Sequence, residues 1–146
     1  MNKKSIYPLN NPSISHILAI DYGRSKVGLA LADRETKIAF AYATLANDKN
    51  FLEKIKEIIE KELVDRIIIG ISFYINGESL KNEEERMGKL IKDTFPDMKI
   101  EYQNEMFTTK IAEINLAEKG IKKIKKYDDQ EAARIILQEW LNNVKM

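Results

Sequence analysis

The order of apolar and polar positions divides the first third of the chain into three short strands. Apolar runs over 16–22 and 26–33 are separated by residues rich in turn-forming and cationic types, a pattern typical of strand, tight turn, strand. After a turn at Asp33, Arg34 and Glu35, side chains spaced by two predict a third strand over 37–45. The positions spaced by two are Ile38, Phe40, Tyr42 and Thr44. Short links between the strands indicate an antiparallel meander.

Helical periodicity alternates with two further strands in the rest of the chain. Apolar positions that recur every three or four residues predict helices over about 50–63, 79–94, 108–118 and 129–143. A short continuous apolar run over 66–71 is typical of a strand buried on both faces, which we expect to be central and parallel to the first strand. A last short strand is expected over 99–103. The side chains expected to face inward from the second helix are Met87, Leu90, Ile91 and Phe95.

The predicted fold is α/β: a mixed five-stranded sheet, with three antiparallel strands followed by parallel strands, flanked by helices. A chain of 146 residues, 44% of them hydrophobic, is the size of one domain and buries a core without disulfides. We expect one domain over 16–146. A flexible N-terminal arm is expected over 1–15, where polar residues and two prolines show no periodicity.

Composition excludes several kinds of site. The chain has no cysteine, which excludes disulfides and thiolate chemistry, and its one histidine excludes a zinc site that needs two imidazoles. No apolar run approaches the roughly 18 residues that span a bilayer, and the N-terminus lacks the apolar block of a signal peptide. We therefore expect a cytoplasmic protein without a membrane partner. Lysine and arginine (24) nearly balance aspartate and glutamate (23), so net charge does not indicate a partner.

Asp21 ends the first apolar run and is the first candidate for chemistry. A carboxylate after four apolar residues is costly to desolvate unless a cation or hydrogen-bond donors meet it. Gly23 and Gly28 lack a Cβ, so a backbone or a phosphate can approach closely. Asp21 is equally well explained as the cap of a hairpin turn that accepts hydrogen bonds from backbone amides. Both interpretations stay open.

Two further carboxylates are candidates because of their positions in predicted elements. Asp129 begins the last helix in phase with its apolar stripe, and Ala132 and Ala133 let this helix approach the sheet. Capping and the helix dipole also explain an aspartate at a helix start, and from the residues alone we favour that interpretation. Glu105 directly follows the last strand, so Glu105 and Asp21 are expected to emerge at carboxyl ends of parallel strands.

Three carboxylates that converge on one edge of the sheet form an oxygen-only metal site. Mg²⁺ and Mn²⁺ take such ligands and complete their coordination shell with water and substrate phosphate. Two such ions activate water and stabilise the leaving oxygen in phosphodiester hydrolysis. The sequence therefore indicates phosphodiester chemistry if Asp21, Glu105 and Asp129 meet in the fold.

Hydroxyl and basic groups near these carboxylates are candidates for nucleic-acid contacts. They are Thr108 and Thr109 at a predicted helix start and the lysines Lys122, Lys123, Lys125 and Lys126 before the last helix. Helix capping alone explains one threonine. A run of lysines in a loop is equally explained as a solvated segment.

Four blocks of the sequence resemble the signature of the YqgF/RuvX family, which has the ribonuclease H-like fold and comprises Holliday-junction resolvases and pre-ribosomal RNA nucleases. The blocks are Ala19-Ile20-Asp21-Tyr22-Gly23 through Gly28-Leu29-Ala30, the Ile69-Gly70 strand with its Gly77 loop, Asn104-Glu105-Met106-Phe107-Thr108-Thr109, and Asp129-Gln130-Glu131-Ala132-Ala133 with Ile136-Leu137-Gln138. The resemblance implies that Asp21, Glu105 and Asp129 are the catalytic, metal-binding positions. It also implies that the lysine-rich link is the family's basic, mobile segment.

Three departures from the family pattern leave the carboxylates in place and change their neighbours. Lys26, which we assign to nucleic-acid binding, stands where the family usually has an arginine, so a point charge replaces a bidentate fork. Asn104 and Met106 flank Glu105 where an acidic and a basic residue are usual. Ser72-Phe73-Tyr74 replaces a proline and polar residues. A catalytically silent member of the family is therefore an alternative.

The resemblance predicts a metal-dependent endonuclease, using Mg²⁺ or Mn²⁺, that hydrolyses phosphodiesters of structured nucleic acid. Pre-16S rRNA end processing in ribosome biogenesis is the favoured role, ahead of cleavage of Holliday junctions in branched DNA. Two alternatives remain: a non-catalytic RNA-binding or assembly factor, and a phosphate-binding module like that of the sugar kinase and actin superfamily, which needs two such domains. A monomer or a homodimer is expected, and a two-fold junction would call for the dimer.

Overall fold

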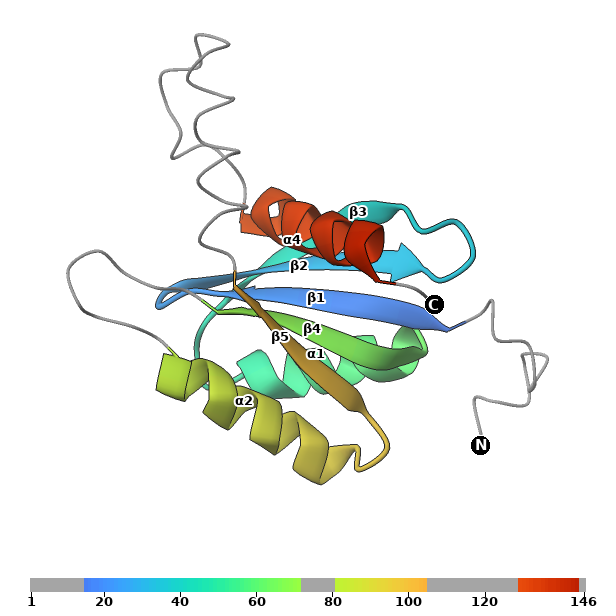
Figure 1. Ribbon diagram of the computed structural model, residues 1–146. Helices are drawn as coiled ribbons and strands as arrows, with labels where there is room; N and C mark the ends of the chain where they lie inside the picture. Colours follow the sequence, from blue (N-terminus) through green and yellow to red (C-terminus); the bar gives the residue numbers. More distant parts are fainter. Residues whose placement is uncertain (1–14, 72–80, 105–128, 145–146) are drawn as a thin grey trace, which may run out of the picture.

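Five strands form one mixed sheet whose order is β3-β2-β1-β4-β5 (Figure 1). The computed structural model describes residues 15–71, 81–104 and 129–144. The strands are β1 (His16–Tyr22), β2 (Lys26–Asp33), β3 (Ala39–Ala46), β4 (Val64–Ile71) and β5 (Lys99–Asn104). The first three pair in antiparallel fashion, whereas β4 pairs parallel to β1, and β5 parallel to β4. The predicted mixed topology is confirmed, with β1 and the apolar β4 at the centre.

Helices cover both faces of this sheet, which makes three layers (Figure 1). The described helices are α1 (Phe51–Lys61), α2 (Lys81–Thr94) and α4 (Asp129–Asn143). Side chains alternate between the faces of a strand: Leu18 and Ile20 of β1 pack with α1 and α2, whereas Ile17 and Ala19 pack with α4. In the described part of the chain, α4 is therefore the one helix that covers this face of the sheet. It packs mainly over β2 and extends to β3 and β1.

The third strand corrects the expected alternation of side chains. A bulge lies opposite the step from Leu29 to Ala30, so the pairing advances from Ala43 to Ala41 and leaves Tyr42 as the extra residue. A bulge changes the phase of the side chains along a strand. The predicted strand is present, but its alternate residues do not all share a face: Tyr42 packs against the α1 layer, whereas Thr44 faces α4.

In α2 one expectation of burial is wrong, and one buried residue was not predicted. Leu90 of α2 is 41% exposed, while Met87 and Ile91 are buried as expected. Glu84 of the same helix is completely buried, which the acidic character of this segment did not suggest. The inward stripe of α2 is therefore rotated toward Glu84 and away from Leu90.

Several predicted segments lie outside the described residues. They are the helix expected over 108–118, the loop over 72–79, and the N-terminal arm except for Ser15.

The last helix, Asp129–Asn143, agrees with its predicted range of 129–143. None of the helices within the described ranges is long and apolar enough to cross a membrane.

Candidate functional site

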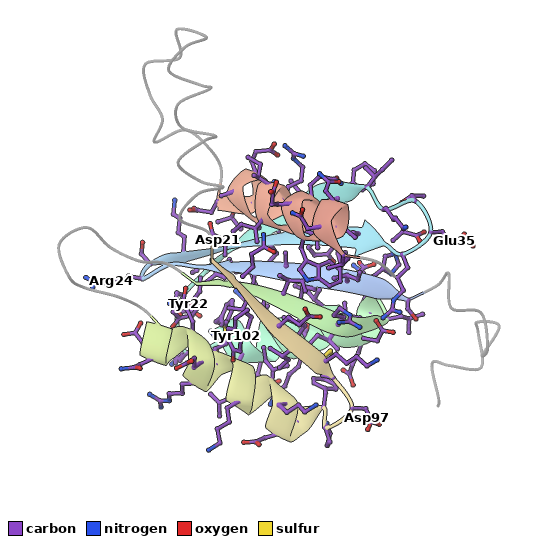
Figure 2. All side chains as sticks on the ribbon, viewed as in Figure 1. Asp21, Tyr22, Arg24, Glu35, Asp97 and Tyr102 are labelled. Atoms are coloured by element: carbon purple, nitrogen blue, oxygen red, sulfur yellow. The ribbon has the colours of Figure 1, made fainter. Side chains whose placement is uncertain are left out.

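Asp21 lies near the carboxyl end of the central strand β1, on the face covered by α4. It shares this face with Ile17 and Ala19, because residues two apart in a strand point the same way. Its carboxylate is half-buried at the edge of the apolar layer, and Figure 2 shows it at the end of the sheet where α4 begins. Its Cα partners are Gly28 on β2 and Gly70 on β4. Asp21 therefore stands between two residues without side chains.

The first turn of α4 rests directly on Gly28. A Cβ built on Gly28 meets the backbone nitrogen of Gln130 at 2.7 Å and the carbonyl of Asp129 at a still shorter distance. Only glycine permits this approach, since real Cβ atoms essentially never come within 3.0 Å of another heavy atom. Because Gly28 is the cross-strand partner of Asp21, the fold brings the start of α4, with Asp129, beside Asp21.

The rest of α4 explains why its first turn is held so close. Ala132, Ala133 and Ile136 are buried against the sheet, and Asp129 continues their stripe one turn earlier. The alanines allow a short distance between helix and sheet, as expected from the sequence. The role of Gly28 as the contact point was not predicted, although a glycine opposite a strand-end carboxylate is a detectable signal of close backbone approach.

Two polar contacts fix α4 on either side of Asp21. The row of cross-strand partners through Asp21 continues to Thr44 on β3 and to Gln103 on β5. The Thr44 hydroxyl donates to Oε1 of Gln130 at 3.2 Å. On the other side, Nε2 of Gln103 donates to the carbonyl of Ile136 at 3.2 Å. Neither residue was predicted to belong to the site, because only the strand pairing reveals that they share a row with Asp21.

Lys26 begins β2 and is exposed, at the same end of the sheet as Asp21. Of the predicted set, the structure therefore brings Asp129 beside Asp21 and places Lys26 at the same end of the sheet. The other predicted site residues lie outside the described part of the chain: Glu105, Thr108, Thr109, Lys122, Lys123, Lys125 and Lys126. In the chain, Glu105 comes directly after Asn104, the last residue of β5, and Asn104 pairs with the residue after Gly70.

The described residues supply two carboxylates of a possible metal site. Within the described ranges no group of three or more histidine, cysteine, aspartate or glutamate side chains is placed to hold a metal ion. Asp21 and Asp129 supply oxygen donors only, which suits Mg²⁺ or Mn²⁺ and does not suit a soft metal. A donor set of this kind needs a third protein ligand or water and phosphate to complete an octahedron.

The tyrosines with shifted pKa values lie on the opposite face of the sheet. Burial and a hydrogen bond to Glu62 raise the pKa of Tyr42 to about 12. Burial and the nearby carboxylates of Glu85 and Glu84 raise the pKa of Tyr102. Both tyrosines therefore keep their protons at neutral pH, and neither shares the α4 face with Asp21.

Comparisons of sequence give one consistent result. The family model "RuvX: Holliday junction resolvase" matches residues 15–143. A protein of Bacteroides fragilis named "Putative pre-16S rRNA nuclease" is 34% identical over 139 residues, which cover 91% of this chain and 100% of the relative. A protein with the same name from Maridesulfovibrio salexigens is 36% identical over 131 residues, covering 86% of this chain and 96% of the relative.

Solved structures share the fold at much lower identity. The fowlpox virus resolvase in complex with its substrate Holliday junction DNA superposes with a TM-score of 0.55 at 15% identity, covering 87% of this chain and 97% of that chain. The Thermus thermophilus RuvC in complex with a Holliday junction substrate also has a TM-score of 0.55, at 11% identity, covering 87% and 93%. These likenesses confirm the predicted ribonuclease H-like architecture.

Proposed function

The chain belongs to the RuvX family of nucleases, and from this premise we propose that it is a metal-dependent endonuclease that hydrolyses phosphodiesters in the precursor of 16S ribosomal RNA. The observation that carries the proposal is the close contact between the first turn of α4 and Gly28. This contact puts Asp129 beside Asp21 at the carboxyl end of β1. This is the edge at which α/β sheets place their sites. We propose that this activity takes place in the cytoplasm.

We propose that Asp21, Asp129 and Glu105 hold Mg²⁺ or Mn²⁺. Asp21 and Asp129 supply hard oxygen donors on rigid elements. Asp21 lies on the central strand, and Asp129 lies on a helix that is hydrogen-bonded to the sheet through Thr44 and Gln130. Glu105 enters this set by the family resemblance and by its place directly after β5. When bound, the metal lowers the pKa of a water molecule and stabilises charge on the phosphate.

The remaining task of the protein is to position the phosphodiester. Gly70 on β4 lies beside Asp21 and has no side chain to obstruct a phosphate at this edge, whereas the space over Gly28 on β2 is filled by the first turn of α4. The start of α4 contributes the positive end of a helix dipole beside the same edge. Thr44 and Gln103 hold the helix in register with the strands, which keeps the spacing of the two carboxylates fixed. Rigid placement matters, because a misplacement of about 1 Å costs roughly 100-fold in rate.

RNA is proposed ahead of DNA because the curated relatives, which the chain matches over nearly its whole length, carry an RNA nuclease name. The family description names a Holliday junction resolvase, so a four-way DNA junction is the second candidate substrate. Whether a monomer or a homodimer acts is part of the same question, since a two-fold junction is matched by a two-fold dimer.

The test is cleavage of labelled pre-16S rRNA fragments and of four-way DNA junctions, with Mg²⁺, with Mn²⁺ and with EDTA. We expect cleavage of the RNA with either ion, none with EDTA, and no requirement for ATP. Preferential cutting of the junction assigns the chain to resolution of branched DNA. Binding of RNA without cleavage under any of these conditions identifies a silent member that acts as an RNA-binding factor.

A further inference from the structure

The turn between β1 and β2 carries an exposed cationic group close to the carboxylate site. The turn covers residues 23–25, and Arg24, Ser25 and the following Lys26 are exposed. Arg24 follows Asp21 by three residues, so their Cα atoms are at most about 11 Å apart. Figure 2 shows both at the same end of the sheet, with Arg24 at the tip of the turn.

This turn is held in place from both of its ends. Asn47, the residue after β3, donates from its side-chain Nδ2 to the carbonyl of Gly23 at 2.7 Å. The backbone amide of Asn47 donates to the carbonyl of Ser25 at 2.9 Å. Gly23 is also tightly enclosed, because a Cβ there lies 2.5 Å from the carbonyl oxygen of Lys26. A three-residue turn with these restraints has few conformations open to it.

We propose that this turn binds a backbone phosphate of the nucleic acid through Arg24, and that Asn47 holds the turn so that Arg24 is positioned for this contact. A guanidinium binds phosphate oxygens through two parallel hydrogen bonds, which fixes a strand more firmly than a point charge does. The phosphate bound is a neighbour of the one cut, because Arg24 lies beyond the end of β1 while Asp21 lies within it. The inference rests on the proposed function in two respects: nucleic acid is the ligand, and Asp21 belongs to the site that cuts it.

Asn47 has a definite part in this arrangement. Without the side-chain amide of Asn47, the carbonyl of Gly23 loses this hydrogen bond, and of the two bonds from Asn47 the turn keeps only the backbone bond at Ser25. Arg24 then has to be ordered when the phosphate binds, at a cost in conformational entropy. Asn47 itself is half-buried under the turn, so it acts through Arg24 and not by touching the ligand.

The experiment measures binding without cleavage, in EDTA, on a labelled RNA hairpin with a single-stranded 3′ extension and on DNA of the same sequence. The variants are Arg24→Ala, Arg24→Lys and a control, Arg86→Ala, which removes an exposed arginine of α2 on the other side of the sheet. We expect Arg24→Ala to weaken binding about tenfold near 0.1 M salt. The fall of the logarithm of the binding constant with the logarithm of salt concentration is expected to become shallower by about 1. Arg24→Lys retains the slope and binds less tightly than wild type.

A double-mutant cycle separates positioning from general stability. Asn47→Ala is expected to weaken binding several-fold in the wild-type background and to have no further effect in the Arg24→Ala background. A merely structural role for Asn47 predicts the same loss in both backgrounds. Circular dichroism and thermal unfolding of each variant show whether the fold is retained.

Two results overturn the inference: a loss for Arg24→Ala no larger than that for Arg86→Ala, or a wild-type protein that binds neither RNA nor DNA. Because phosphate is common to both nucleic acids, the loss is expected on each. Cleavage is measured separately, in the RNA and junction assays described above. A protein that binds through Arg24 and never cuts therefore refutes the proposed nuclease while supporting the turn, and a nuclease insensitive to Arg24→Ala does the reverse.

Discussion

Replacing Gly28 by alanine is expected to lift α4 from the sheet and to disable the site without altering any carboxylate. The added Cβ meets two consecutive backbone groups of α4, with the nitrogen of Gln130 only 2.7 Å away and the carbonyl of Asp129 closer still. Ordinary van der Waals contact begins at 3.4 Å, so the first turn has to move by more than about 0.7 Å. Backbone atoms of a regular helix cannot relieve this clash by rotating about a side-chain bond, as a flexible side chain can.

The cost follows from this displacement. Overpacking of a filled interior costs about 1–3 kcal/mol, and the loss of unfolded-state entropy on replacing glycine returns about 0.4–1 kcal/mol. A net loss of about 1.5 kcal/mol lowers the Tm of a 146-residue protein by about 5 °C. Cleavage is expected to fall by about 100-fold or more, since Asp129 moves relative to Asp21 by a distance that matters for catalysis.

Gly88→Ala is the matched control for this prediction. Its Cβ meets the hydroxyl end of Tyr102, a flexible side chain that is 40% exposed, and comes within 3.3 Å of the side-chain end of Ile69, but it meets no backbone atom among these nearest contacts. The change also improves helix propensity in α2 by about 1 kcal/mol. We expect Gly88→Ala to keep stability and cleavage near wild type in urea unfolding and in the RNA assay. If Gly28→Ala is as stable and as active as Gly88→Ala, α4 does not rest on Gly28 and the site described here is wrong.

Three smaller predictions concern stability. Lys37 is exposed with φ at 56°, so Lys37→Gly relieves left-handed strain and raises the free energy of unfolding by about 0.5–1 kcal/mol in urea titration. The raised pKa of Tyr42 means that the native state holds this proton more tightly, so its contribution to stability is complete below pH 10 and is lost as the pH rises toward about 12. Tyr42→Phe, which also removes the bond to Glu62, is expected to lack that part of the alkaline loss in thermal unfolding against pH. Trp140→Phe removes the indole donor to Glu101 at 3.3 Å and costs about 1 kcal/mol, whereas unchanged stability contradicts a role for that bond.

Much of the architecture could be predicted because it depends on local periodicity. The continuous apolar run of β4 indicated a central strand, and the stripe of α4 placed Asp129 toward the sheet. Asp21 could be placed at a strand end because the apolar run before it stops there. These features need only the period of the chain and the rule for where sites lie in α/β sheets.

Other features could not be predicted because they depend on pairing between distant segments. The bulge at Tyr42 arises from the register of β3 on β2, and the same register pairs Thr44 with Gly28, where Thr44 meets Gln130. The burial of Glu84 depends on how α2 is rotated against the sheet, which an acidic helix sequence does not specify. Gln103 joins the row of Asp21 only through two successive strand pairings.

The account turns on whether carboxylates from β1 and α4 share one metal site, and Mn²⁺ binding measured by calorimetry tests this most directly. The proteins are wild type, Asp21→Asn, Asp129→Asn, the double variant, and Asp97→Asn as a control, since Figure 2 places Asp97 far from Asp21 at the opposite end of the sheet. We predict that each site variant weakens Mn²⁺ binding at least tenfold, that the double variant is little worse than either single one, and that Asp97→Asn matches wild type. Wild-type affinity in Asp129→Asn, or independent and additive losses in the double variant, would contradict a shared site.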